Sequence, residues 1–270
     1  LETQSNPWGF GSNTRSDWAK ELDLKIWDKY NPTEYLYFVG CNGSFDDRGK
    51  KIATAVVHSL KSAGVDFSIL GNEEGCTGDP ARRAGNEYLF DLLASRNAKL
   101  FKEKSIIKIV THCPHCFNSL KNEYAEFGVE LDVIHHSELL EYLVKNGKSI
   151  GERKQPGNVV YHDSCYLGRH NKLYDEPREI IAHNSESGKV LEVDASRERG
   201  TCCGAGGGRF LLEEKTGLRM SHQRIDQLME SNPDTIAVSC PFCVLMLEDA
   251  LKAKNLQEKV KVKDISELAS

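Results

Sequence analysis

Nine cysteines carry most of the chemistry that this 270-residue sequence offers. An odd number leaves one thiol over in any disulfide framework, and Leu1–Ser5 show no export signal. Metal binding or redox chemistry is therefore the better starting interpretation, because soft thiolates select zinc, copper or iron–sulfur clusters. The candidate metal ligands are Cys41, Cys76, Cys113, Cys116, Cys165, Cys202, Cys203, Cys240 and Cys243.

The cysteine pattern occurs twice along the chain. The first four cysteines lie 124 to 127 residues before Cys165, Cys202, Cys240 and Cys243. Neighbouring residues follow the same period, since Gly78 matches Gly204 and Ser137-Glu138-Leu139 matches Ser266-Glu267-Leu268. We interpret this as an internal duplication with four thiols in the first copy and five in the second.

The spacing favours iron–sulfur binding over zinc. Zinc takes four ligands, often from two short knuckles, whereas each half offers one Cys-Pro-x-Cys pair with its other cysteines far away in sequence. The five cysteines of the second half also exceed a tetrahedral set. A thioredoxin-like Cys-x-x-Cys explains neither the duplication nor the distant cysteines.

Strands and helices alternate in both halves, which predicts parallel βαβ units. Ligands collect at the carboxyl edge of such sheets, and three of the four cysteine positions in each half follow a predicted strand. We expect a helix to begin at each Cys-Pro-x-Cys, and Gly204, Gly206 and Gly207 to let backbone amides approach a cluster. The predicted strands are 35–39, 65–70, 106–110, 131–134, 159–161, 190–193, 235–238 and 260–262, with helices at 47–63, at 81–95 and after Pro114.

The expected architecture is α/β, with two duplicated domains related by a pseudo-twofold axis, each a small parallel sheet flanked by helices. Residues 1–32 have no counterpart in the second half and form an N-terminal extension that packs on the body or on a partner. The domains span 33–147 and 158–270, joined by a polar Gly- and Lys-rich linker at 146–158.

The motif Cys165…Cys202-Cys203-Gly204…Cys240-Pro241-Phe242-Cys243 resembles the cysteine-rich "CCG" domain, and the resemblance covers about residues 33–270. That domain occurs twice in the catalytic subunit of heterodisulfide reductases. Stretches such as Val39–Ser44, Cys76–Arg83 and Tyr161–His170 are most similar to the C-terminal part of membrane-bound oxidoreductases that pass electrons from electron-transfer flavoprotein to quinone. The membrane and ferredoxin-type parts of those proteins are missing, which fits a fragment or a separately encoded subunit.

The resemblance implies a noncubane [4Fe-4S] cluster at the five-cysteine site. In the first half Thr77 replaces one cysteine of the pair, and four thiolates still suit a cubane [4Fe-4S] cluster. The alternatives at this site are a modified noncubane cluster or no cluster. The implied function is electron transfer between a flavoprotein or ferredoxin-type donor and a quinone pool, as a subunit of a redox complex with flavoprotein, ferredoxin-type or membrane partners. The alternatives are disulfide cleavage at the noncubane cluster and, from another class, a zinc-stabilised interaction module.

Other residues are weaker candidates. His162 and Asp163 precede Cys165, where hydrogen bonding that orients the loop competes with proton donation to a substrate. His112 and His115 flank Cys113, and histidine replaces cysteine at some clusters. A net charge of −5 argues against nucleic acid as a partner, and no apolar run is long enough to span a membrane. We expect a cytoplasmic protein that associates with membranes through a partner or a missing N-terminal part.

Overall fold

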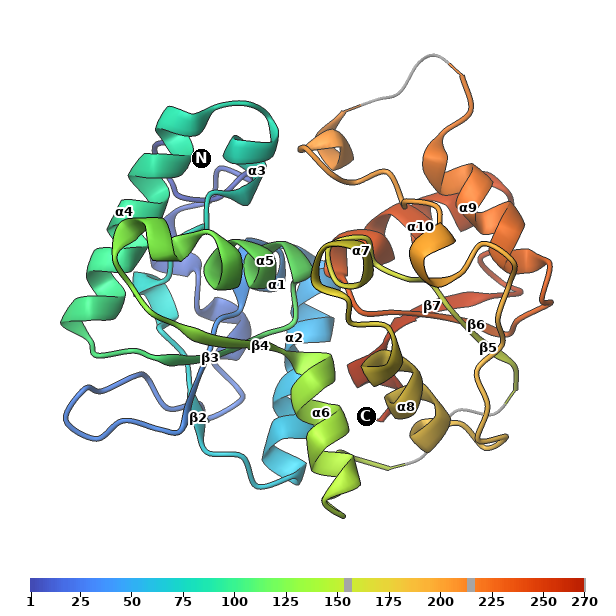
Figure 1. Cartoon of the computed structure of the whole chain (residues 1–270), viewed down its shortest axis with the longest axis horizontal. Helices are drawn as coiled ribbons and strands as arrows, with labels where there is room; N and C mark the ends of the chain where they lie inside the picture. The colour runs from blue at the N-terminus through green and yellow to red at the C-terminus, as the bar shows by residue number, and fades with distance from the viewer. Residues whose placement is uncertain (153–156, 213–216, 270) are drawn as a thin grey trace.

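Two α/β units lie side by side, one from each half of the sequence (Figure 1). The computed structural model describes residues 1–152, 157–212 and 217–269. The predicted linker at 146–158 therefore falls partly outside the described residues, at 153–156. Among the described residues, no helix combines the length and the apolarity that crossing a membrane requires.

The first unit is a four-stranded parallel sheet in the order β2-β1-β3-β4. Its central strands come from short apolar runs that are buried on both faces, as parallel strands covered by helices must be. The strands are β1 (Tyr35–Tyr37), β2 (Phe67–Ser68), β3 (Lys108–Thr111) and β4 (Asp132–His135). The helices are α1 (Gly40–Phe45), α2 (Asp47–Ser62), α3 (Asp79–Arg83), α4 (Glu87–Glu103), α5 (Pro114–Asn122) and α6 (His136–Lys145).

The second unit repeats this plan with a three-stranded parallel sheet, β5-β6-β7. The predicted class, two duplicated units that each carry a small parallel sheet flanked by helices, is confirmed. The strands are β5 (Val159–Tyr161), β6 (Thr235–Val238) and β7 (Lys261–Asp264). The helices are α7 (Gly168–Asn171), α8 (Asp175–Asn184), α9 (Met220–Met229) and α10 (Pro241–Ala253).

The strand predicted at 190–193 is wrong. Leu191 makes a single parallel bridge to Val160, and its amide donates to the Val159 carbonyl at 2.7 Å. The amide of Val193 then donates to the Ser196 hydroxyl instead of to a strand. The backbone therefore leaves the sheet after one residue.

The helix predicted at 81–95 is divided into α3 and α4. Gly85 lies between them with φ +84°, a left-handed conformation that ends α3. Asn86 then caps α4, because its side-chain oxygen accepts from the amide of Leu89.

The duplicated Ser-Glu-Leu motif is a helix start. His135 caps α6 and Asp264 caps the 3-10 helix Ile265–Leu268, each in a capping box with the glutamate three residues later. Both Cys-Pro-x-Cys motifs likewise begin a helix, with Cys113 and Cys240 at the N-cap, as predicted. The repeated local sequences therefore encode the same local structures in both halves.

Ion pairs join the first unit to the second. Arg48 of α2 contacts both carboxylate oxygens of Glu267 at 2.7 Å and reaches Glu248 of α10 at 2.7 Å. His136 of α6 lies 3.1 Å from the Asp264 carboxylate, and both side chains are fully buried. Figure 1 shows α6 beside α8 and α2 between the sheets, and the two units form a continuous interface there.

The N-terminal extension packs on the body of the protein. The Cys76 amide donates to the Ser5 carbonyl at 3.0 Å, and the indole of Trp27 donates to the Lys104 carbonyl. Trp8 stacks on Phe242 with ring centroids 6.4 Å apart. The extension therefore contacts both halves near their cysteines.

Candidate metal centres

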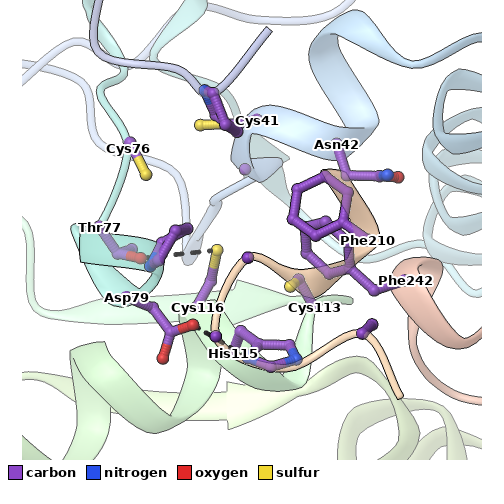
Figure 2. Close-up of a pocket in the computed structure, with 16 residues that line it drawn as sticks. Cys41, Asn42, Cys76, Thr77, Asp79, Cys113, His115, Cys116, Phe210 and Phe242 are labelled. Atoms are coloured by element: carbon purple, nitrogen blue, oxygen red, sulfur yellow. Dashed lines mark hydrogen bonds and ion pairs between the residues drawn. The ribbon is translucent and has the colours of Figure 1, made fainter. Parts of the chain in front are cut away.

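The four cysteines of the first half line one pocket (Figure 2). Cys41 comes from α1 after strand β1, and Cys76 comes from the loop before α3. Cys113 caps α5 after strand β3, and Cys116 lies in the first turn of that helix. All four side chains are buried, so elements far apart in sequence bring the thiols to one place, as predicted.

A buried ion pair that the sequence did not reveal holds Cys41 in place. Glu74 accepts from the amides of Val39 and Gly40 at 2.9 Å, which fixes the start of α1. Arg15 from the N-terminal extension binds Glu74 at 3.0 Å and approaches the Cys41 sulfur at 3.5 Å. The guanidinium of Arg15 therefore places a positive charge beside the cysteines of the first half.

The same turn presents a thiol in each half. The amide of Gly78 donates to Cys76 at 3.4 Å, and the amide of Gly204 donates to Cys202 at 3.3 Å. Both glycines have φ near +90°, at +88° and +91°, which an L residue adopts only with strain. The duplicated glycine is therefore required by a backbone that points an amide at a sulfur.

The five cysteines of the second half also converge. The sulfurs of Cys203 and Cys243 are 3.3 Å apart. Cys165, Cys202, Cys203, Cys240 and Cys243 perturb one another's pKa values, so the five thiols form one interacting group. Cys165 and Cys202 are partly exposed while the other three are buried, which leaves one side of the group open to solvent.

Neighbouring thiols perturb one another's pKa values in both halves. Hydrogen bonding from Cys76 lowers the pKa of Cys41 to about 7 and raises that of Cys76. In the second half, hydrogen bonding from Cys165 lowers the pKa of Cys202 and raises that of Cys165 itself. Neighbouring sulfurs therefore share protons, and iron cations would replace those protons and allow every ligand to be a thiolate. The donor set fits an iron–sulfur cluster in both halves.

His162 lies against the second group of thiols. A ring nitrogen of His162 and the sulfurs of Cys203 and Cys243 lie within 4.8 Å of one another. Its Nδ1 accepts from Arg224 Nε at 3.0 Å, so Nε2 carries the proton in the neutral ring, and Nε2 is buried without a partner among the described residues. Burial and the Arg224 charge lower the pKa of His162 to about 3. A neutral imidazole with a free N–H suits hydrogen bonding to a cluster sulfur.

Asp163 is occupied by structural contacts. Its two oxygens bind Arg178 at 2.7 and 3.0 Å, and Oδ2 also accepts from the Arg197 amide at 2.7 Å. This carboxylate connects the Cys165 loop to α8 and to the segment that leads to Cys202. Its contacts suit orientation of the loop better than proton donation to a substrate.

The glycine-rich segment Gly204–Gly208 contacts both groups of cysteines. Gly204 lies at the second group of thiols, whereas Gly207 and Gly208 line the pocket of the first-half cysteines together with Phe210. Gly206 has no heavy atom within 4 Å of the position that a Cβ would take. The loop that follows the cysteine pair in one half therefore covers the site of the other.

Alanine substitutions at Gly204 and Gly206 should have different effects on the stability of the protein. Gly204→Ala is expected to lower the free energy of unfolding by about 1–3 kcal/mol, because φ is +91° and the new Cβ lies 3.2 Å from Met220 Cβ. Gly206→Ala should change it by less than about 0.5 kcal/mol. Thermal denaturation followed by circular dichroism measures both, and equal destabilisation by the two variants would contradict this account.

His115 and Phe242 occupy the same place in the two Cys-Pro-x-Cys motifs, and both reach the opposite half. Tyr166 of the second half packs against His115 with ring centroids 4.3 Å apart, whereas Phe242 lines the first-half pocket (Figure 2). The pKa of His115 is well above its usual value, because Asp79 and Cys240 together outweigh the lowering effect of burial. The mismatch between His115 and Phe242 is visible in the duplicated sequence, but its consequence depends on how the halves pack.

Two duplicated α/β units with cysteines gathered at the ends of parallel strands define the class as a tandem cysteine-rich domain protein. The family model described as "Cysteine-rich domain" (CCG) matches residues 35–121 and 159–248. The chain belongs to this family, which confirms the resemblance of its motifs.

Curated relatives carry names from iron–sulfur redox chemistry. "Probable iron-sulfur-binding oxidoreductase FadF" of Bacillus subtilis is 44% identical over 99% of this chain and 39% of its own length. "EtfAB:quinone oxidoreductase" of Syntrophomonas wolfei is 42% identical over the same shares. One subunit of the "Dihydromethanophenazine:CoB--CoM heterodisulfide reductase" of Methanosarcina acetivorans is 32% identical over 96% of this chain and 63% of its own length. The chain spans about two fifths of the length of the first two relatives.

Proposed function

We propose that this chain is the cluster-bearing part of an iron–sulfur oxidoreductase that passes electrons between a flavoprotein or ferredoxin-type donor and a quinone pool. The observation that carries the proposal is the convergence of nine thiols on two neighbouring groups, in a chain more than 40% identical to relatives named for this chemistry. The whole redox complex would supply the donor and the membrane part.

In this proposal Cys41, Cys76, Cys113 and Cys116 hold a cubane [4Fe-4S] cluster, and the five cysteines of the second half hold a noncubane one. A bound cluster supplies one-electron transfer. The chain orients the thiolates, directs the Gly78 and Gly204 amides at sulfur and places Arg15 beside Cys41. Thr77 takes the place of a fifth ligand, with its hydroxyl 3.9 Å from the Cys116 sulfur.

Disulfide cleavage at the second site is the second candidate. Cys165 and Cys202 are partly exposed, so a small sulfur compound could approach that site, whereas all four first-half cysteines are buried. Relatives named as heterodisulfide reductase subunits support the same possibility. Under this function the first site would relay electrons and the second would meet the substrate.

Metal analysis of protein purified without air tests the proposal. We expect brown protein with about eight irons and matching sulfide, or about four where only one site is filled. Colourless protein with stoichiometric zinc and no iron would overturn it in favour of a zinc-stabilised interaction module. A change in the electron paramagnetic resonance (EPR) signal of the second site on addition of a mixed disulfide would favour disulfide cleavage over quinone reduction.

A further inference from the structure

Arg15 brings a permanent positive charge from the N-terminal extension to the cysteines of the first half. Its Nη2 donates to the Cys41 sulfur at 3.5 Å, and its side chain is 1% exposed. A guanidinium is not deprotonated in proteins, so this charge is present whatever the pH of the experiment. The contact therefore does not depend on the titration of any group at the site.

Contacts on several sides fix the guanidinium against the sulfur. Nη2 and Nε of Arg15 both donate to Glu74 Oε1, at 3.0 and 3.3 Å. Glu74 in turn accepts from the amides of Val39 and Gly40, both at 2.9 Å. The ring of Phe45 lies 5.5 Å from the guanidinium carbon. The carboxylate is thus shared between Arg15 and backbone amides, while the guanidinium contacts the sulfur.

The segment that carries Arg15 is anchored at the same site. The Ser5 carbonyl accepts from the Cys76 amide at 3.0 Å, and Pro7 lines the pocket of the first-half cysteines. Arg96 of α4 donates to the Ser5 hydroxyl at 3.0 Å. The extension therefore meets the first site at several points, and Arg15 is held there as part of a packed segment.

The second half has nothing in its sequence that corresponds to residues 1–32. Its sulfurs receive contacts from neutral groups, since the Ser164 hydroxyl lies 3.6 Å from the Cys243 sulfur and the Gly204 amide donates to Cys202 at 3.3 Å. A hydrogen bond from a charged donor is roughly twice as strong as one from a neutral donor. The extension thus gives the first site a kind of contact that these neutral groups do not provide.

A charged donor beside a ligand sulfur should change the redox behaviour of a cluster. Reduction adds negative charge, and a hydrogen bond to the ligand sulfur stabilises that charge. Arg15 and Cys41 are 1% and 7% exposed, so little water screens the interaction between them. The expected effect is a higher reduction potential at the site that contains Cys41.

We propose that Arg15 is a positioning residue that acts through Cys41 and raises the reduction potential of the first site. This inference rests on the proposed iron–sulfur function. The first site then accepts one electron more readily from the flavoprotein or ferredoxin-type donor, with no covalent bond formed or broken. Through Arg15 the N-terminal extension makes the two sites unequal in a second way, beyond the replacement of a cysteine by Thr77.

The test is an EPR-monitored redox titration of the anaerobically purified protein. Arg15→Gln removes the charge and should lower the midpoint potential of the first site by a tenfold change in the ratio of oxidised to reduced protein, which is about 59 mV for one electron. Arg15→Lys keeps the charge without the planar fork, and its potential should lie between those of the wild type and Arg15→Gln. The second site is an internal reference and should keep its midpoint potential in both variants.

Arg96→Gln is the matched control. It removes a guanidinium that binds the same extension at the Ser5 hydroxyl, and Arg96 is exposed. Both midpoint potentials should stay as in the wild type. A shift of the first-site potential equal to that of Arg15→Gln would contradict the inference, because it would trace the effect to the packing of the extension.

An unchanged first-site midpoint potential in Arg15→Gln, with the first cluster present, would overturn the inference. If that variant does not assemble its first cluster, Arg15→Lys decides, because its ammonium keeps an ion pair with Glu74 but lacks the two-nitrogen arm that also reaches the sulfur. A first-site potential at or above that of the wild type would then overturn it. Failure of the proposed function is a different result, since wild-type protein without iron would show it before any variant is made.

Discussion

Replacing Cys203 with serine is expected to remove the EPR signal of the second site and leave the signal of the first site unchanged. Cys203 is buried among the five thiols, with its sulfur 3.3 Å from that of Cys243. A hydroxyl is a poor ligand for iron, so the noncubane cluster should be lost or converted. Loss of the cluster would reduce the iron content by about half where both sites are filled.

Cys203→Thr is the matched variant for this experiment. It gives the second half the residue that the first half carries at Thr77, so the second site should come to resemble the first in its EPR spectrum. Cys41→Ser is the reciprocal control and should affect the first signal alone. A second-site spectrum that is unchanged in Cys203→Ser would remove Cys203 from the ligand set.

Replacing Asp163 with alanine is expected to lower the free energy of unfolding by about 3 kcal/mol. The side chains of Asp163 and Arg178 are 3% and 9% exposed, so the substitution leaves a guanidinium largely buried with one of its two carboxylate partners missing. It also removes the acceptor of the Arg197 amide. For a chain of this size the melting temperature should fall by about 6–12 °C, which calorimetry measures.

Asp175→Ala provides the control for Asp163. Asp175 pairs with Arg197 at 2.7 Å, but its side chain is 74% exposed, so its loss should cost less than about 1 kcal/mol. If Asp163→Ala melts like Asp175→Ala yet stops electron transfer, Asp163 acts in the chemistry and its structural role is refuted.

Local sequence was enough to predict the parts of the two sites that lie at element ends. Proline in the first helical turn predicts where α5 and α10 begin, which places Cys113 and Cys240 at two N-caps. Apolar runs before Cys41 and Cys165 predict the strands that deliver these residues. These inferences succeed because capping and strand burial depend on neighbours within a few residues.

Predictions that depended on distant partners were less successful. The run at 190–193 has the apolar residues of a strand, yet it makes one bridge because Val193 binds Ser196 instead of a neighbouring strand. The N-terminal extension was expected to pack on the body or on a partner, but nothing local indicated that Arg15 would bind Glu74 and approach Cys41.

Residue types and their spacing were sufficient to establish a duplicated cysteine-rich protein with four thiols in one half and five in the other. That each half contributes to the site of the other became visible only in the folded chain, where His115 packs against Tyr166 and where Gly207 and Phe242 line the first-half pocket. The difference is one of range. Periodicity and capping report forces within an element, whereas these contacts join residues from opposite halves of the chain and exist only once the two sheets have packed together.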